Sequence, residues 1–138
     1  MSNTYLTYLT GAELSALIRT KQVSPVEVMA HFFERIDLYN DELKAFITTV
    51  PEMAMAEAHR AEAAVIAGDP LGSLHGVPIG VKDLDETMGI RTTYGSHIYS
   101  AHIPKRDSIA VERIKAAGAI IVGKTNTPDF GWKGTTES

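Results

Sequence analysis

Lys82 is the residue with the clearest potential for chemistry, because it directly follows a short apolar run at residues 77–81 (VPIGV). A run of this length and composition is typical of a buried strand. A lysine at the end of such a strand either extends its ammonium to water or finds partners inside the protein. If burial keeps the amine neutral, the amine can accept a proton and act as a base. The structural alternative is an ion pair of Lys82 with Asp83 or Asp85.

A second segment matches a phosphate-loop pattern. Residues 118–125, GAIIVGKT, satisfy G-x-x-x-x-G-K-[ST]. In a phosphate loop the four middle positions form a turn whose amides face the nucleotide. Here those positions are the apolar residues 119–122, which predict a strand instead. Pro128 also argues against a helix already running from Lys124. The sequence therefore argues against nucleotide binding at this segment.

The composition argues against several classes of function. Thirteen Lys and Arg against seventeen Asp and Glu give a net charge of −4, which disfavours a general nucleic-acid-binding protein. The absence of cysteine excludes disulfides, thiolate nucleophiles and Cys-ligated metals. The five histidines have no second ligand at a metal-binding spacing, so we expect no metal site. They are His31, His59, His75, His97 and His102.

No segment indicates a membrane or a secretory route. No apolar run approaches the roughly 20 residues needed to cross a bilayer. The N-terminus, MSNTYLTYLTGAEL, has neither the basic leader nor the apolar core of a signal peptide. We therefore expect a cytoplasmic protein that does not associate with a membrane.

The elements that precede Lys82 are predicted to be mainly helices with clear start signals. Thr10 with Glu13, and Ser24 with Glu27, have the spacing of capping boxes. They predict one helix after residue 10 and a second over residues 25–39. A short strand is expected over residues 45–49, and a third helix opens at residue 51 and stops at Gly68. Its inner stripe would consist of Ala54, Ala58, Ala61 and Val65.

The second half alternates between short strands and a helix. Strands are expected over residues 77–81 and 119–122, with loops and short strands over residues 83–107 between them. Ser108 or Asp107 would cap a helix whose inner residues are Ala110, Val111, Ile114 and Ala117. This order predicts the α/β class, with N-terminal helices over about residues 10–68 and an α/β core starting at about residue 76. Because two or three short buried strands cannot close a sheet, we expect residues 1–138 to be the N-terminal part of a single larger domain.

Three segments carry a resemblance to a known family. They are GVPIGVKD at 76–83, GIRTTYGS at 89–96, and AAGAIIVGKTNTPDFGWKGTTES at 116–138. Together they resemble the amidase signature family, and the similarity extends over essentially the whole chain. The resemblance implies the first part of the amidase signature fold, with a mixed, largely parallel sheet. It also implies that Lys82 is the terminal base of a Ser–cis-Ser–Lys triad.

The resemblance places both triad serines in a glycine- and serine-rich segment downstream of residue 138. Ser96, Ser108 and Ser138 match neither of them. The implied activity is hydrolysis of a small-molecule carboxylic amide through an acyl-enzyme, without a metal or an organic cofactor. This chain alone is then expected to be inactive, and the full-length protein could form a homo-oligomer.

Two other readings stay open at this point. The resemblance also fits the amide-transferring subunit of a tRNA-dependent amidotransferase, which passes ammonia to a partner. The chain could also be a non-catalytic fragment.

Overall fold

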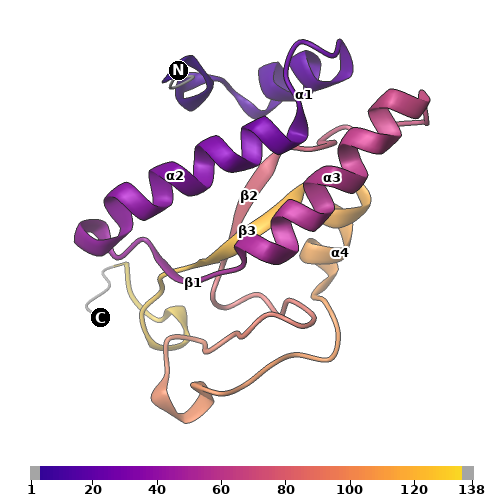
Figure 1. Cartoon of the computed structure of the whole chain (residues 1–138). Coiled ribbons are helices and arrows are strands. Elements are labelled where there is room, and N and C mark those ends of the chain that lie inside the picture. Colours follow the sequence, from indigo (N-terminus) through magenta and orange to yellow (C-terminus); the bar gives the residue numbers. More distant parts are fainter. Residues whose placement is uncertain (1–3, 135–138) are drawn as a thin grey trace.

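Three strands form a mixed sheet in the order β1-β3-β2 at the centre of the computed structural model, which describes residues 4–134 (Figure 1). They are β1 (Phe46–Thr49), β2 (Pro78–Lys82) and β3 (Ile120–Thr125). β2 pairs with β3 in parallel and sets Lys82 opposite Thr125. β1 pairs with β3 antiparallel and sets Phe46 opposite the same Thr125. The predicted α/β class and mixed sheet are confirmed. β3 extends beyond the predicted residue 122, and this places Lys124 inside the strand.

Helices flank this sheet. They are α1 (Gly11–Arg19), α2 (Pro25–Leu43), α3 (Pro51–Ala67) and α4 (Ile109–Ala116), with short 3-10 helices η1 (Thr4–Tyr8), η2 (His97–Tyr99) and η3 (Asp129–Gly131). Both predicted capping boxes are present, at the starts of α1 and α2. α2 runs past the predicted residue 39 and ends at Leu43, where it is capped by Lys44 with a left-handed φ of 49°. No helix within residues 4–134 is both long and apolar enough to cross a membrane.

The larger hydrophobic core lies between the first three helices and one face of the sheet. Leu14 and Ile18 of α1 and Val28 and Met29 of α2 belong to one buried cluster that also contains strand residues Ile120 and Val122. The predicted small-residue stripe of α3 is buried, as expected for a helix that approaches its neighbours closely. Gly68 ends α3 with a φ of 77°, as predicted.

A smaller core lies on the other face of the sheet. It joins Val81 of β2, Ile121 of β3, Val111 of α4 and Ile90 of the loop after β2. Ser108 caps α4, as expected, but Ala110 is exposed, so its prediction as an inner residue is wrong. α4 has only 8 residues, and of these only Val111 is fully buried.

Residues 83–107 form the predicted loop, without the short strands that were also expected there, and lie beyond the lower end of the sheet in Figure 1. Two backbone hydrogen bonds close its base: the Gly89 amide donates to the Pro104 carbonyl over 3.1 Å, and the Thr92 amide donates to the His102 carbonyl over 3.0 Å. The Arg91 guanidinium also donates to the Thr48 hydroxyl of β1 over 2.9 Å. The loop is therefore closed on itself and tied to the sheet.

An irregularity in register interrupts the pairing of β2 with β3. Ile79 lies opposite Ile121, whereas the next residue, Gly80, lies opposite Gly123, so Val122 is an extra residue in β3. A bulge of this kind reverses the side-chain alternation beyond it. This places Lys124 on the same side as Ile121, facing the loop, and away from the larger core.

Candidate active site

Lys82 is the last residue of β2, and its side chain is exposed. Its position is at the carboxyl end of two adjacent parallel strands, where open α/β sheets typically bind ligands. Within residues 4–134 its ammonium has no hydrogen bond and no ion pair. The structural alternative, an ion pair with Asp83 or Asp85, is therefore wrong for the described part of the chain. Of the two outcomes expected for a lysine at a strand end, Lys82 therefore adopts the first, with its side chain extended to solvent.

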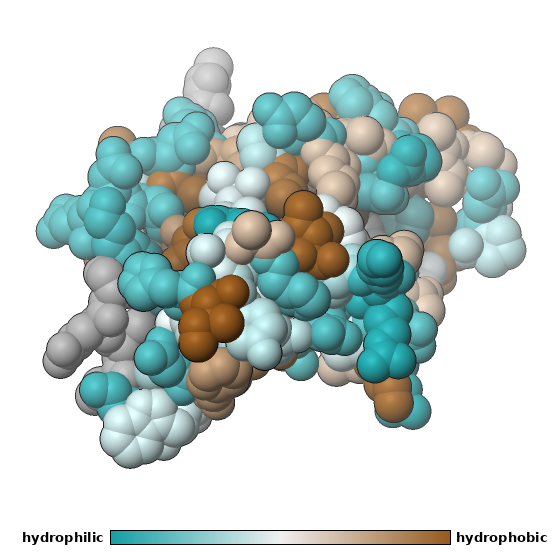
Figure 2. Space-filling model, turned by 90° about the horizontal axis from the view of Figure 1, so that it is seen from below, coloured by the Kyte–Doolittle hydropathy of each residue, from teal (hydrophilic) through white to brown (hydrophobic). Residues whose placement is uncertain are grey.

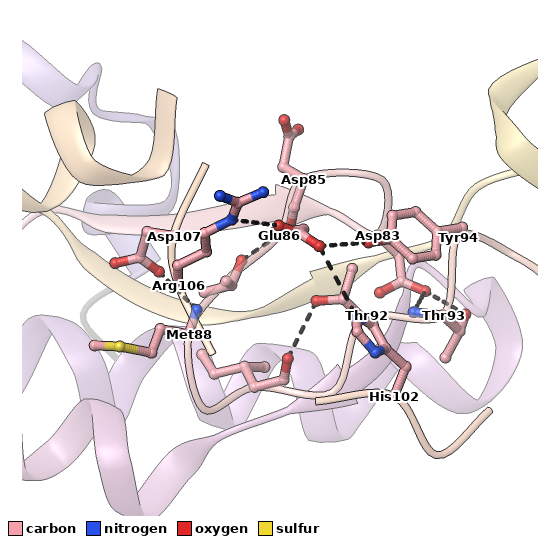
Figure 3. A network of polar contacts seen from close by, with 12 residues as sticks. Asp83, Asp85, Glu86, Met88, Thr92, Thr93, Tyr94, His102, Arg106 and Asp107 are labelled. Atoms are coloured by element: carbon pink, nitrogen blue, oxygen red, sulfur yellow. Dashed lines mark hydrogen bonds and ion pairs between the residues drawn. The ribbon is translucent and has the colours of Figure 1, made fainter. Parts of the chain in front are cut away.

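The next residue, Asp83, points inward and is fully buried. Its Oδ2 accepts a hydrogen bond from the Thr93 amide over 3.0 Å and another from the Thr93 hydroxyl. Its backbone amide donates to the Thr125 carbonyl, and its carbonyl accepts from the Tyr94 amide, both over 3.0 Å. Figure 3 shows this pairing of Asp83 with Thr93. The backbone at Asp83, directly after Lys82, is consequently held by β3 through its amide and by the loop through its carbonyl.

The second oxygen of Asp83 has a different environment. Asp83 Oδ1 is buried, and no hydrogen-bond donor among residues 4–134 reaches it. A buried carboxylate oxygen without a donor is costly. Next to Lys82, Asp83 thus has one carboxylate oxygen that is hydrogen-bonded and one that is buried without a donor from the described residues.

Lys124 of β3 lies behind the turn that follows Lys82. Its side chain is fully buried, and its ammonium donates to the Asp85 carbonyl, to Thr87 Oγ1 over 2.8 Å and to Thr92 Oγ1 over 3.1 Å. Burial lowers the pKa of Lys124 to about 8, while the charges of Asp83, Asp85 and Asp107 act in the opposite direction. This lysine is held by neutral oxygens, and it forms no direct ion pair with any of residues 4–134.

Glu86 organises the outer side of the same loop (Figure 3). The Tyr94 hydroxyl donates to Glu86 Oε1 over 2.9 Å, while Arg106 Nε lies 3.7 Å from Oε2 and His102 Nε2 lies 3.9 Å from Oε1. Burial and the contact with Glu86 raise the pKa of the Tyr94 phenol. The Tyr94 ring stacks on Phe130, with ring centroids 6.2 Å apart. Glu86 therefore lies at the centre of the contacts among Tyr94, His102 and Arg106.

Neither of two cavities in the described structure includes Lys82. The larger one, of about 410 Å³, lies among α3, α4 and the start of β3, and the smaller one, of about 200 Å³, lies between the end of α2 and β1. The face seen from below in Figure 1 mixes hydrophobic and hydrophilic side chains (Figure 2). Lys82 is therefore an exposed residue at a strand end rather than part of an enclosed pocket.

The other candidate residues have structural surroundings. No group of three or more His, Asp or Glu that could hold a metal ion occurs within residues 4–134. His31 shares a hydrogen bond with Thr7 Oγ1, and His75 Nε2 contacts the Ala61 carbonyl, each over 2.9 Å. The phosphate-loop match coincides with strand β3, as its apolar residues predicted. Ser138 lies outside the described residues.

Sequence reasoning missed the burial of Lys124 and the pairing of Asp83 with Thr93. Lys124 stands out in the sequence only as part of the phosphate-loop pattern, and its burial depends on the bulge in β3, which no pattern in the sequence marks. A lysine that continues an apolar strand was the one available signal. The pairing of Asp83 with Thr93 joins residues 10 positions apart across an irregular loop, for which periodicity gives no signal.

Comparison with known proteins gives the family. The family model for amidases matches residues 27–138. The A-subunit of the glutamyl-tRNA(Gln) amidotransferase of Salinispora arenicola is 41% identical over 134 residues, which cover 97% of this chain and 27% of the relative. The corresponding protein of Carboxydothermus hydrogenoformans is 37% identical over 133 residues and is covered to the same 27%. This chain thus spans about 27% of the length of these curated relatives.

Solved structures agree with this result. A bacterial aryl acylamidase of the amidase signature enzymes has a TM-score of 0.88 and 28% identity, covering 94% of this chain and 27% of that protein. The peptide amidase from Stenotrophomonas maltophilia has a TM-score of 0.83 and 27% identity, covering 89% of this chain and 26% of that protein. The fold, the matched residues and the relatives agree: the chain belongs to the amidase family, with the amidase signature fold.

Proposed function

We propose that the whole protein cleaves a carboxylic amide through an acyl-enzyme and that Lys82 is the terminal base of its triad. The observation that carries this proposal is the position of Lys82. It is exposed at the carboxyl end of β2 and has no ion-pair partner within residues 4–134, while the backbone that follows it is fixed by Asp83. An amine placed in this way is free to exchange a proton with a neighbouring hydroxyl.

In the proposed reaction, the neutral Lys82 amine accepts a proton from a bridging serine, which takes one from the nucleophilic serine. The nucleophilic oxygen bonds to the amide carbonyl carbon, and backbone amides stabilise the oxyanion. The proton then passes to the leaving nitrogen as the carbon–nitrogen bond breaks. Water cleaves the resulting ester and releases the carboxylic acid. Both serines would come from the whole protein, so residues 1–138 alone should release no amine.

A second candidate is the amide-transferring subunit of a tRNA-dependent amidotransferase. The relatives at 37% and 41% identity favour it, since both are components of a glutamyl-tRNA(Gln) amidotransferase. The acyl-enzyme chemistry at Lys82 would be the same, but the released ammonia would pass to a partner. Co-purification of a second protein, together with ammonia release that depends on it, would favour this candidate. Full turnover of simple amides without a partner would favour a hydrolase.

Replacement of Lys82 in the full-length protein tests the proposed chemistry. Lys82→Ala should lower kcat by about 10²–10⁴-fold, because that is the usual contribution of base catalysis. Lys82→Arg should not restore turnover, since a guanidinium stays protonated and cannot accept the proton. The measurement is amine or ammonia release from a panel of amides, with the exposed Lys105→Ala as a matched control. Near-normal turnover in Lys82→Arg would show that Lys82 is not the base.

A further inference from the structure

We infer that Lys124 is a positioning residue for Lys82: its buried ammonium fixes the turn that holds the main chain of the proposed base. This inference rests on the function proposed above. It adds a role for a second lysine, which does not contact the substrate.

Two consecutive hydrogen bonds connect the two lysines. The Lys82 carbonyl accepts a hydrogen bond from the Asp85 amide over 3.0 Å. The carbonyl of the same Asp85 accepts a hydrogen bond from the Lys124 ammonium. The Asp85 residue is therefore held at both its amide and its carbonyl, and its orientation sets where the chain leaves Lys82.

The remaining ammonium contacts hold the rest of the turn. Thr87 Oγ1 accepts from Lys124 over 2.8 Å and itself donates to the Asp85 carbonyl over 3.1 Å. Thr92 Oγ1 accepts from Lys124 over 3.1 Å and donates to the Ile90 carbonyl over 3.1 Å. One charged group thus links three points of the loop to the central strand of the described sheet.

The geometry separates the roles of the two lysines. Lys124 is 0% exposed, and its three donated hydrogen bonds match the three protons of an ammonium. Its side chain is closed off from solvent in the described structure, whereas Lys82 is exposed. Burying the Lys124 ammonium costs desolvation free energy, which an apolar residue such as methionine would not carry. What Lys124 offers and methionine lacks is a set of directed hydrogen bonds.

The test compares Lys124→Met with Lys105→Met in the full-length protein. Methionine keeps much of the length of the side chain but donates no hydrogen bond, and Lys105 is an exposed lysine whose loss removes the same charge. Amide hydrogen exchange is measured on peptides that cover residues 83–92. We expect Lys124→Met to speed exchange at Asp85 by at least about tenfold, since the turn opens locally, and Lys105→Met to leave it unchanged.

Kinetics on the same variants test the link to Lys82. We expect Lys124→Met to lower kcat by about 10–100-fold with KM within about threefold, because a displaced catalytic group reduces rate more than binding. In a Lys82→Ala background, Lys124→Met should have less than about a twofold effect, since the two residues act through one group. An equal loss in both backgrounds would show a general structural role and overturn the inference.

Failure of the proposed function and failure of this inference give different results. If Lys82→Ala keeps full turnover, the proposed function fails, whereas unchanged exchange at Asp85 in a folded Lys124→Met protein overturns the inference by itself. If Lys124→Met does not fold, Thr87→Val serves as the milder variant, because it removes one hydroxyl of the network while keeping its shape. Unchanged exchange and unchanged kcat in Thr87→Val would then overturn the inference.

Discussion

Two lysines on neighbouring strands have opposite environments. Lys82 ends β2 and extends to water, whereas Lys124 in β3 is fully buried among loop oxygens. Burial disfavours the charged form of an amine, and it lowers the pKa of Lys124 to about 8. The difference arises from the strand register rather than from residue type.

The pKa of Lys124 predicts a pH dependence of stability. Burial lowers this pKa from 10.5 to about 8 in the folded protein. Between these two values the unfolded chain binds more protons, so this group makes the free energy of unfolding rise with pH. Its destabilising effect is complete below pH 8 and is lost as pH approaches 10.5. Over that window the unfolding free energy of the wild type, minus that of Lys124→Met, should increase by up to roughly 3 kcal/mol.

Denaturant unfolding of both proteins at pH 7, 8, 9 and about 10 measures this difference. Subtracting the variant removes the contributions of groups that titrate in both proteins. A difference that stays flat or falls over this range would contradict a buried, protonated Lys124.

The position of Lys82 at a strand end could be predicted from the sequence, because an apolar run followed directly by a lysine is a local pattern. The partners of Asp83 and Lys124 could not be predicted in the same way. Thr87, Thr92 and Thr93 meet them only after an irregular loop has folded back on the sheet, and no period relates these positions.

At the scale of elements, Gly123 allows β1 to approach β3 closely. A Cβ at this position would collide with the Thr48 carbonyl oxygen and would lie 3.1 Å from Phe46 Cδ1. These atoms belong to the backbone and to a packed ring, so little can move aside. A residue without a side chain is therefore required at position 123, where β3 pairs with β1.

Gly123→Ala should consequently lower the free energy of unfolding by about 1–3 kcal/mol or more, as for other overpacked sites. Gly11→Ala is the matched control, because a Cβ there meets only Val77 Cγ1 at an ordinary 3.7 Å. Thermal or denaturant unfolding of the two variants gives the comparison. Equal stability of Gly123→Ala and the wild type would show that β1 is not packed against β3 in this way.

Most helices could be predicted from the sequence, since capping boxes, Pro51 and Gly68 are local signals that the structure confirms. The end of β3 and the buried face of α4 could not be predicted as well. β3 continues through a glycine and a lysine because the bulge turns Lys124 towards polar partners. Ala110 looked apolar enough to face inward, but a helix of 8 residues leaves it exposed.

At the scale of the molecule, the described sheet has two unpaired edges. β1 and β2 each pair only with the central β3. Large hydrophobic side chains are also exposed, among them Ile98 at 86%, Trp132 at 76% and Phe130 at 58%. Open edges together with exposed apolar side chains favour association between chains.

The isolated 138-residue chain should therefore self-associate or unfold without a cooperative transition. Light scattering coupled to size-exclusion chromatography, over a range of concentrations, measures the association, and calorimetry measures the transition. A monodisperse monomer with a cooperative transition would show that these edges and side chains need no further cover.

The base of the loop over residues 83–107, closed by the Gly89–Pro104 and Thr92–His102 hydrogen bonds, also has a use in protein engineering. Residues 97–101 beyond these bonds are exposed, and their backbone–backbone hydrogen bonds stay within residues 96–102. A compact loop closed at its base can accept added residues at its tip. A short epitope tag inserted between Ser100 and Ala101 should therefore be displayed without shifting Lys82, making this tip a suitable place for a label.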